Sequence, residues 1–85
     1  MIKVRVYGKM GESLGNRSPF LIDSGERRIK LRELIGKLPG GEELIRKNIA
    51  FILLVNGRNC IFADGMDTEI GADDVVDVLP PVVGG

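Results

Sequence analysis

Residues 31–41 have the sequence Leu31-Arg32-Glu33-Leu34-Ile35-Gly36-Lys37-Leu38-Pro39-Gly40-Gly41, and they decide the fold of this chain. The apolar residues of this stretch recur at i, i+3, i+4 and i+7, which predicts an amphipathic helix with one buried face. They are Leu31, Leu34, Ile35 and Leu38. The Pro-Gly-Gly sequence that follows ends the helix. Acidic residues four positions before basic ones predict a second, short helical turn over residues 42–47.

Two strands are predicted before this helix. Residues 2–7 alternate apolar and polar side chains, the period of a strand with one buried face. Pro19-Phe20-Leu21-Ile22, followed by a turn sequence, predicts an edge strand that forms a hairpin with the first strand. Residues 8–17 hold three glycines without a phosphate-binding spacing, and we expect a mobile connection there. The basic residues at positions 27, 28, 30 and 32 are predicted to be a solvated helix entrance.

Three further strands are predicted after the helix. Residues 50–55 form a continuous apolar run that ends at Asn56-Gly57, which predicts a well-buried strand and a tight hairpin. Cys60-Ile61-Phe62 is predicted as the return strand, and residues 66–72 as turns around a buried Ile70. In residues 75–79, Val76 and Val78 face one side of the sheet, while Asp77 and Leu79 face the other.

This order of elements predicts an α+β fold in which a mixed sheet of four to five strands packs on one main helix. One helix covers one face of the sheet only, so the opposite face stays exposed and carries Tyr7 and Leu79. If the first and last strands are neighbours, Lys3 or Arg5 is placed to pair with Asp77.

The composition limits what the chain can do by itself. Its 85 residues make one domain, with 44% hydrophobic and 28% charged residues and no apolar run long enough to span a membrane. The first residues alternate instead of forming a signal peptide, so we expect a cytoplasmic protein. Histidine is absent and Cys60 is the one cysteine, which excludes Ser-His-Asp and Cys-His nucleophile arrangements and the usual zinc ligand sets. We expect Cys60 to be a structural core residue.

Charge is distributed unevenly along the sequence. Residues 1–42 carry nine Lys or Arg and five Asp or Glu, whereas residues 43–85 carry three and seven. The acidic residues precede the end of the chain in sequence. They indicate either a partner that is basic around the point where it receives that end, or solvated loop carboxylates.

The last six residues are Pro80-Pro81-Val82-Val83-Gly84-Gly85. Adjacent prolines cannot donate ladder hydrogen bonds, so they end the preceding strand, and they favour an extended segment that reaches about 20 Å. The two glycines have no Cβ and can pass through a channel that side chains would block. We therefore expect a domain over residues 1–79 and a flexible tail over residues 80–85 that presents the carboxylate of Gly85 to a partner.

In these features the chain resembles the β-grasp, ubiquitin-like sulfur carrier family (MoaD/ThiS). The resemblance spans the whole chain and is most specific at the ending Pro80-Pro81-Val82-Val83-Gly84-Gly85, which favours the molybdopterin branch of the family. Three internal pieces also carry it: Ile2-Lys3-Val4, Val55-Asn56-Gly57 and Asp73-Asp74-Val75-Val76. Lys30 departs from the Thr or Ser helix cap common in relatives, and residues 42–48 and 63–72 are extra length.

The resemblance implies a carrier rather than an enzyme, with no bound cofactor and no metal. An E1-like adenylyltransferase would use ATP to adenylate the carboxylate of Gly85, and sulfur would then replace AMP to give a thiocarboxylate. A carboxyl of pKa about 3.3 to 3.7 is an anion at pH 7 and resists nucleophilic attack until it is activated in this way. The large subunit of molybdopterin synthase, or another sulfur acceptor enzyme, would be the second partner. Neither nucleic acid nor membrane is implied. Partner contacts are expected at residues shared with the family: Tyr7, Leu79, Pro80, Pro81, Val82, Val83 and Gly84.

The sequence leaves three alternatives open. The Gly85 acyl group could end on a substrate lysine, as in a protein modifier, and no processing protease would be needed for that. The sulfur could serve thiamine synthesis or tRNA thiolation. Finally, the sheet could bind a partner non-covalently, in which case the tail would be dispensable.

Overall fold

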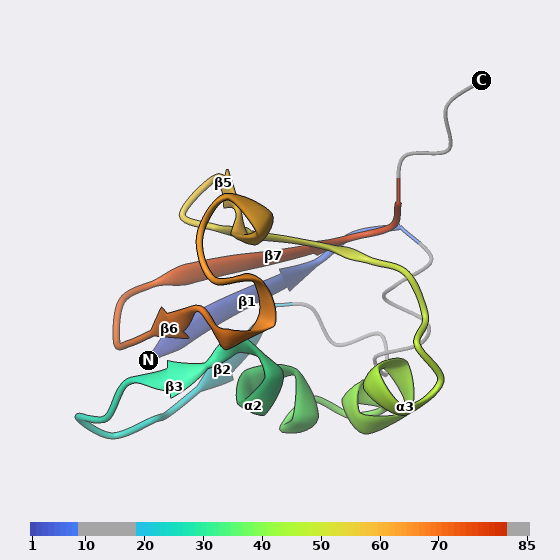
Figure 1. The fold of residues 1–85 in the computed structure, drawn as a ribbon. Helices are drawn as coiled ribbons and strands as arrows, with labels where there is room; N and C mark the ends of the chain where they lie inside the picture. The colour runs from blue at the N-terminus through green and yellow to red at the C-terminus, as the bar shows by residue number, and fades with distance from the viewer. Residues whose placement is uncertain (9–18, 82–85) are drawn as a thin grey trace.

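The computed structural model describes residues 1–8 and 19–81. Five strands form one mixed sheet in the order β2-β1-β7-β4-β5, in which β1 and β7 are parallel neighbours and the other pairs are antiparallel. Two short helices lie on one side of this sheet (Figure 1). The predicted β-grasp architecture is thus confirmed. The bounds are β1 Ile2–Val6, β2 Phe20–Ile22, α2 Leu31–Gly36, α3 Gly41–Arg46, β4 Ile52–Val55, β5 Arg58–Asn59 and β7 Val75–Leu79.

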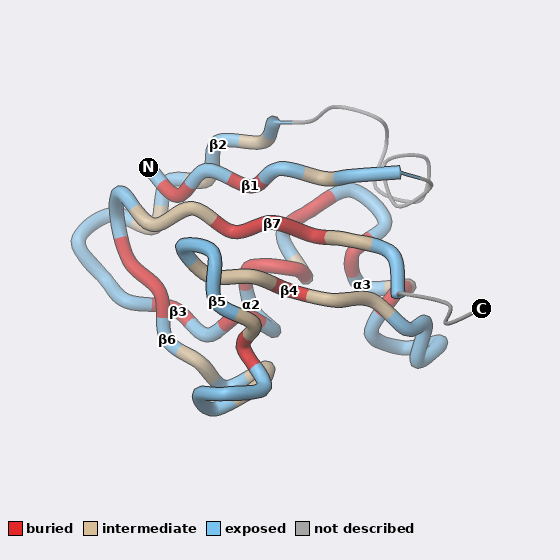
Figure 2. The backbone as a smooth tube through the Cα atoms, turned by 90° about the horizontal axis from the view of Figure 1, so that it is seen from above, coloured by how far each residue is buried: buried red, intermediate tan, exposed pale blue. Residues whose placement is uncertain are grey.

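The core lies between the sheet and α2. The predicted stripe on α2 is buried, with Leu31, Leu34 and Ile35 at 0% exposure and Leu38 at 3%. Although α2 ends at Gly36, the Leu38 N–H donates to the Ile35 carbonyl at 3.1 Å, so a tight turn carries Leu38 inward. From the sheet, the inward residues of β1 and β7 meet this stripe, and the buried part of β7 lies mid-strand (Figure 2). These residues are Ile2, Val4, Val76 and Val78.

The second helix, α3, confirms the predicted short helical turn and starts against the end of α2. A Cβ on Gly41 would lie 1.7 Å from the Ile35 carbonyl oxygen, so only glycine permits this contact between the helices. The Gly41 N–H donates to the Leu38 carbonyl at 2.9 Å. Glu43 pairs with Lys47 four residues on, as the acid-before-base spacing predicts, whereas Arg46 pairs with the same Glu43 three residues before it.

A second, two-stranded sheet was not predicted. It pairs β3 (Ile29–Lys30) with β6 (Glu69–Ile70) in antiparallel register. Ile29 and Ile70 are both buried, which confirms the burial of Ile70 but corrects the assignment of turns alone around it. The predicted helix entrance is confirmed as solvated, because its basic residues at positions 27, 28, 30 and 32 are all exposed. Two residues of it, Ile29 and Lys30, form β3, which continues directly into α2 with Lys30 at the N-cap position and no side-chain cap.

Two predictions about the β4–β5 hairpin are wrong in detail. Cys60–Phe62 is the 3-10 turn η1 rather than a strand, because the Asn59 side chain accepts the Ile61 N–H at 3.1 Å and caps the turn. The return strand is the shorter β5. Within β4 only Leu53 is fully buried, and the other residues are partly exposed, so the strand is less buried than its apolar run predicted. The Asn56-Gly57 hairpin is confirmed, with both residues at positive φ.

The two charged parts of the sequence meet each other in the fold. Arg32 and Lys30 lie 2.9 and 3.8 Å from the Asp67 carboxylate, and the Arg32 hydrogen bond holds the pKa of Asp67 below its usual value. The acidic loop that contains Asp67 precedes the start of β7, whereas the tail leaves from the other end of that strand (Figure 1). Asp67 therefore lies away from the point where the tail leaves the sheet, which favours the alternative of solvated loop carboxylates over a partner that is basic around the tail.

Within the described part of the chain, no helix is long and apolar enough to cross a membrane. The same residues contain no group of three or more side chains placed to hold a metal ion.

Candidate functional site

The candidate site is the end of β7, from which the tail departs. β7 is the middle strand of the sheet, paired with β1 on one side and β4 on the other. Both neighbours reach its last residues, since the Tyr7 N–H donates to the Val78 carbonyl at 2.9 Å and Leu79 stands opposite Ile52. The tail therefore begins at a strand that is held along both edges.

The chain leaves the sheet where the prolines predict. The strand ends at Leu79, and Pro80 and Pro81 are exposed outside it. Gly8 lies against the Pro80 ring: a Cβ on Gly8 would be 3.3 Å from Pro80 Cγ, and its φ of +62° is in the left-handed region. A side chain at position 8 would be strained and would press on the ring, so Gly8 lets the two segments pass closely.

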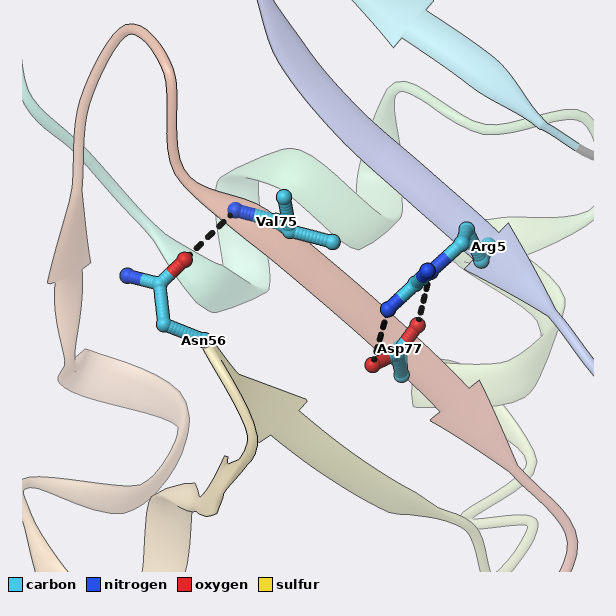
Figure 3. A network of polar contacts seen from close by, with 4 residues as sticks. All are labelled: Arg5, Asn56, Val75 and Asp77. Atoms are coloured by element: carbon cyan, nitrogen blue, oxygen red, sulfur yellow. Dashed lines mark hydrogen bonds and ion pairs between the residues drawn. The ribbon is translucent and has the colours of Figure 1, made fainter.

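The other end of β7 is fixed by the Asn56 side chain. Asn56 Oδ1 accepts the Val75 N–H at 2.9 Å (Figure 3), and its Nδ2 donates to Asp74 Oδ1 at 3.0 Å. Asp74 Oδ2 in turn accepts the Gly71 N–H at 2.8 Å. Two of the sequence pieces that carry the family resemblance, Val55-Asn56-Gly57 and Asp73-Asp74-Val75-Val76, are thus bound to each other, and together they set where β7 starts.

Arg5 and Asp77 join the two parallel strands in the middle of the sheet. They face each other in register, and two hydrogen bonds connect the guanidinium to the carboxylate, from Arg5 Nε at 2.6 Å and Nη2 at 3.1 Å (Figure 3). The Asp77 side chain is 9% exposed and the Arg5 side chain 46%. The hydrogen bond to Asp77 raises the pKa of Arg5, which stays protonated. Of the two predicted partners for Asp77, Arg5 is the correct one.

An apolar row crosses the outer face of the sheet at the tail end. Tyr7, 42% exposed, follows β1 directly, Leu79 ends β7, and Ile52 begins β4 opposite Leu79. The parallel register places Tyr7 beside Leu79, so the two predicted residues of the outer face are neighbours. Ile52 and, further along β4, Leu54 were missed. The signal was available: a run apolar at every position supplies both faces of its strand.

The remaining predicted site residues are Val82, Val83, Gly84 and Gly85, and they lie outside the described residues. Cys60 is buried, as predicted for a core residue, at 7% exposure. Burial raises the pKa of its thiol, so the thiolate that a nucleophile requires is disfavoured.

Comparison with known proteins identifies the family. Residues 4–85 match the model of the ThiS family. The chain belongs to the ThiS family. A curated relative, a putative sulfur carrier protein of Archaeoglobus fulgidus, is 46% identical over 33 residues, an alignment that spans 39% of this chain and 38% of the relative.

Two solved structures of similar fold cover nearly the whole chain. The small archaeal modifier protein 1 of Methanosarcina acetivorans is 27% identical, with a TM-score of 0.65 and coverage of 99% of this chain and 95% of that one. The second structure is a chain from the protein–protein complex of subunits 1 and 2 of the molybdopterin-converting factor of Helicobacter pylori. That chain is 23% identical, with a TM-score of 0.60 and coverage of 99% of this chain and 97% of that one. The chain is thus similar in sequence to a protein named as a sulfur carrier and similar in structure to a small archaeal modifier protein, while the second solved structure shows the shared fold.

Proposed function

We propose that this chain carries sulfur on the carboxylate of Gly85. An E1-like adenylyltransferase activates that carboxylate with ATP, and the resulting thiocarboxylate donates sulfur to an acceptor enzyme. The observation that carries the proposal is the placement of the tail: Pro80 and Pro81 leave the middle strand of the sheet, exposed and held at their base by both neighbouring strands.

The chemistry divides cleanly between the chain and its partners. The Gly85 carboxylate attacks the α-phosphorus of ATP, pyrophosphate leaves, and an acyl adenylate forms. A sulfur nucleophile supplied by the activating system then attacks the acyl carbon, and AMP leaves with the electron pair of the broken C–O bond. The chain supplies a carboxylate on an extended arm. It has no histidine, and its one cysteine is buried, so the activating and transferring groups belong to the partners.

Partner recognition is assigned to the apolar row on the outer face. Tyr7, Leu79 and Ile52 lie at the same end of the sheet as the tail, so an enzyme that encloses the tail would cover them. In the Helicobacter pylori relative, subunit 1 binds subunit 2 of the molybdopterin-converting factor. By analogy, the acceptor proposed for this chain is the large subunit of molybdopterin synthase. The choice of this pathway rests on the Pro-Pro-x-x-Gly-Gly ending.

The test is ATP–pyrophosphate exchange with an E1-like adenylyltransferase from the same organism. The parent chain should support exchange. Removal of Gly85, or addition of one alanine after it, moves the carboxylate by about 3.3 to 3.6 Å, whereas a misplacement of about 1 Å can cost on the order of 100-fold in rate. Both variants should therefore lose exchange.

The melting temperature is the control, because the described core ends at Val78, β7 ends at Leu79, and neither change touches them. Parent-like exchange by either variant would mean that the tail is not the acyl carrier. In that case a non-covalent interaction module would be the better interpretation.

A second candidate is a ubiquitin-like modifier that ends on a substrate lysine. The similarity to the small archaeal modifier protein 1 of Methanosarcina acetivorans favours it. Both candidates share the adenylation step and differ in the product. The intact mass of protein purified from its native host distinguishes them: one terminal oxygen replaced by sulfur indicates the carrier, and an attached protein indicates the modifier.

A further inference from the structure

An apolar groove beside β4 is not explained by the tail or by the outer face. Its volume is about 530 Å³, and it lies between the start of β4 and the turn η1. Among the described residues that line it, none is charged, and Asn48 and Asn59 are the polar ones. Ile49 and Ile61 stay 41% and 70% exposed. The apolar lining residues are Ile49, Ala50, Phe51, Ile52, Leu53, Cys60, Ile61 and Met66.

The groove lies along the first half of β4, which pairs with β7 on one side but has no strand among the described residues on the other. β5 pairs with β4 only through Leu54↔Asn59 and Val55↔Arg58. Cys60, the next residue, turns away into η1, and β5 is the last strand of the described sheet on this side. The first half of β4 therefore presents a free edge to the groove, and such an edge is a template for an added strand.

The direction of the backbone groups supports strand addition. The Asn56 N–H points toward β7, because it donates to the carbonyl of Val75 on that strand. Backbone groups alternate along an antiparallel strand, so those of Leu54 and Ile52 also face β7, and those of Leu53 and Phe51 face the groove. A segment laid along this edge would meet backbone donors and acceptors in the middle of an apolar surface.

The position of the groove favours an occupant that also receives the tail. Ile52 stands opposite Leu79, so the free half of β4 lies at the tail end of the sheet. A strand added there would run two strand spacings, about 10 Å, from β7. A single protein that encloses the tail would reach both places.

We propose that the enzyme that activates Gly85 with ATP places an extended apolar segment in this groove, paired with the edge of β4 at Phe51 and Leu53. This inference rests on the proposed function and adds a second contact to it. The tail delivers the reacting carboxylate, while the groove supplies binding energy at a site distant from the reaction. Loss of the groove contact should therefore weaken binding without slowing the chemical step.

The test uses Ile61→Glu in the full chain, with Leu21→Glu as the matched control. Both side chains are aliphatic and highly exposed, at 70% and 61%, so neither change should disturb folding. Leu21 lies on β2, at the opposite edge of the sheet, and pairs with Lys3 far from the tail. In pyrophosphate exchange with the activating enzyme, Ile61→Glu should raise the KM for the chain about tenfold or more at unchanged kcat. Leu21→Glu should match the parent.

Amide hydrogen exchange measured by NMR tests the pairing itself. Adding the activating enzyme should slow exchange of the Phe51 and Leu53 amides in the parent and should slow it much less in Ile61→Glu. An unchanged KM for Ile61→Glu would overturn the inference and leave the proposed function intact. A raised KM without slower exchange at Phe51 and Leu53 would overturn the added strand. If the parent itself supports no exchange of pyrophosphate, the proposed function fails and this inference falls with it.

Discussion

The junction between the two helices gives the sharpest test of the fold. Gly41 begins α3 against the last turn of α2, where a Cβ would lie 1.7 Å from the Ile35 carbonyl oxygen and 2.7 Å from its carbon. Contacts below 3.0 Å do not occur for real Cβ atoms, so Gly41→Ala must move α3 away by at least the difference between 1.7 and 3.0 Å. That movement would also stretch the hydrogen bond from the Gly41 N–H to the Leu38 carbonyl, now 2.9 Å.

The expected cost follows from these two effects. Overpacking against a backbone atom costs about 1–3 kcal/mol, and loss of one buried hydrogen bond about 1 kcal/mol more. We expect Gly41→Ala to lower the free energy of unfolding by about 3 kcal/mol, a large share of the stability of a small domain. Gly36 is the matched control, because it ends α2 and a Cβ there meets nothing within 4 Å. Gly36→Ala should stabilise the protein by about 0.5–1 kcal/mol, since alanine favours the helix.

Urea denaturation, followed by circular dichroism and fitted with a common m-value, measures both changes. The same glycine-to-alanine substitution should thus act with opposite sign at two positions five residues apart. A Gly41→Ala variant within about 1 kcal/mol of the parent would refute the packing of α3 on α2 described here.

Three further predictions concern the core, the ion pair and the cysteine. Leu34→Ala should cost about 2–5 kcal/mol in urea denaturation because Leu34 is fully buried, whereas Leu21→Ala at an exposed site should stay within about 0.5 kcal/mol. Arg5→Gln should lower the melting temperature more than Asp77→Asn. The first variant leaves the Asp77 carboxylate, 9% exposed, without its guanidinium, whereas the second leaves the Arg5 guanidinium, which water can reach. A larger drop in melting temperature for Asp77→Asn would contradict the pairing. Cys60 has a thiol pKa raised by burial, so the stability it contributes is complete below the unfolded pKa of about 8.5 and is lost as pH rises beyond it. Relative to Cys60→Ala, the parent should lose stability above that pH, and parallel pH profiles would count against this burial.

The sequence predicted those parts of the fold whose signals extend over several residues. The leucine stripe of α2, the alternation in β1 and β7 and the Asn56-Gly57 turn are each repeated or chemically unambiguous, and all three are confirmed. The strands β3 and β6 are two residues long, which is too short for any period to appear. Their pairing depends on Ile29 and Ile70 meeting in the core, a contact between residues 41 positions apart that local patterns do not encode.

The candidate site was predicted only in part, because some of its features also lack a local sequence signal. The break at Pro80 and the pair Tyr7 and Leu79 followed from strand alternation and proline chemistry. Ile52 was missed because a continuous apolar run conceals which residues face outward. The free edge of β4 was missed as well, because the sequence suggested a strand at residues 60–62 where the Asn59 side chain instead starts the turn η1.

The choice of β7 as the strand that bears the tail has a physical reason. An edge strand has a partner on one side only and frays more easily, so a tail attached to it would move with each opening of its hydrogen bonds. β7 is bonded along both sides, fixed at its start by Asn56 and crossed in its middle by the Arg5–Asp77 pair. A partner that binds the tail therefore does not displace its base, because β7 is the most extensively bonded strand of the sheet. The distance from Pro80 to the carboxylate then depends on the number of residues between them. This is why a change of one residue at position 85 is expected to abolish activation while a change on the far edge of the sheet, at Leu21, is expected to leave it intact.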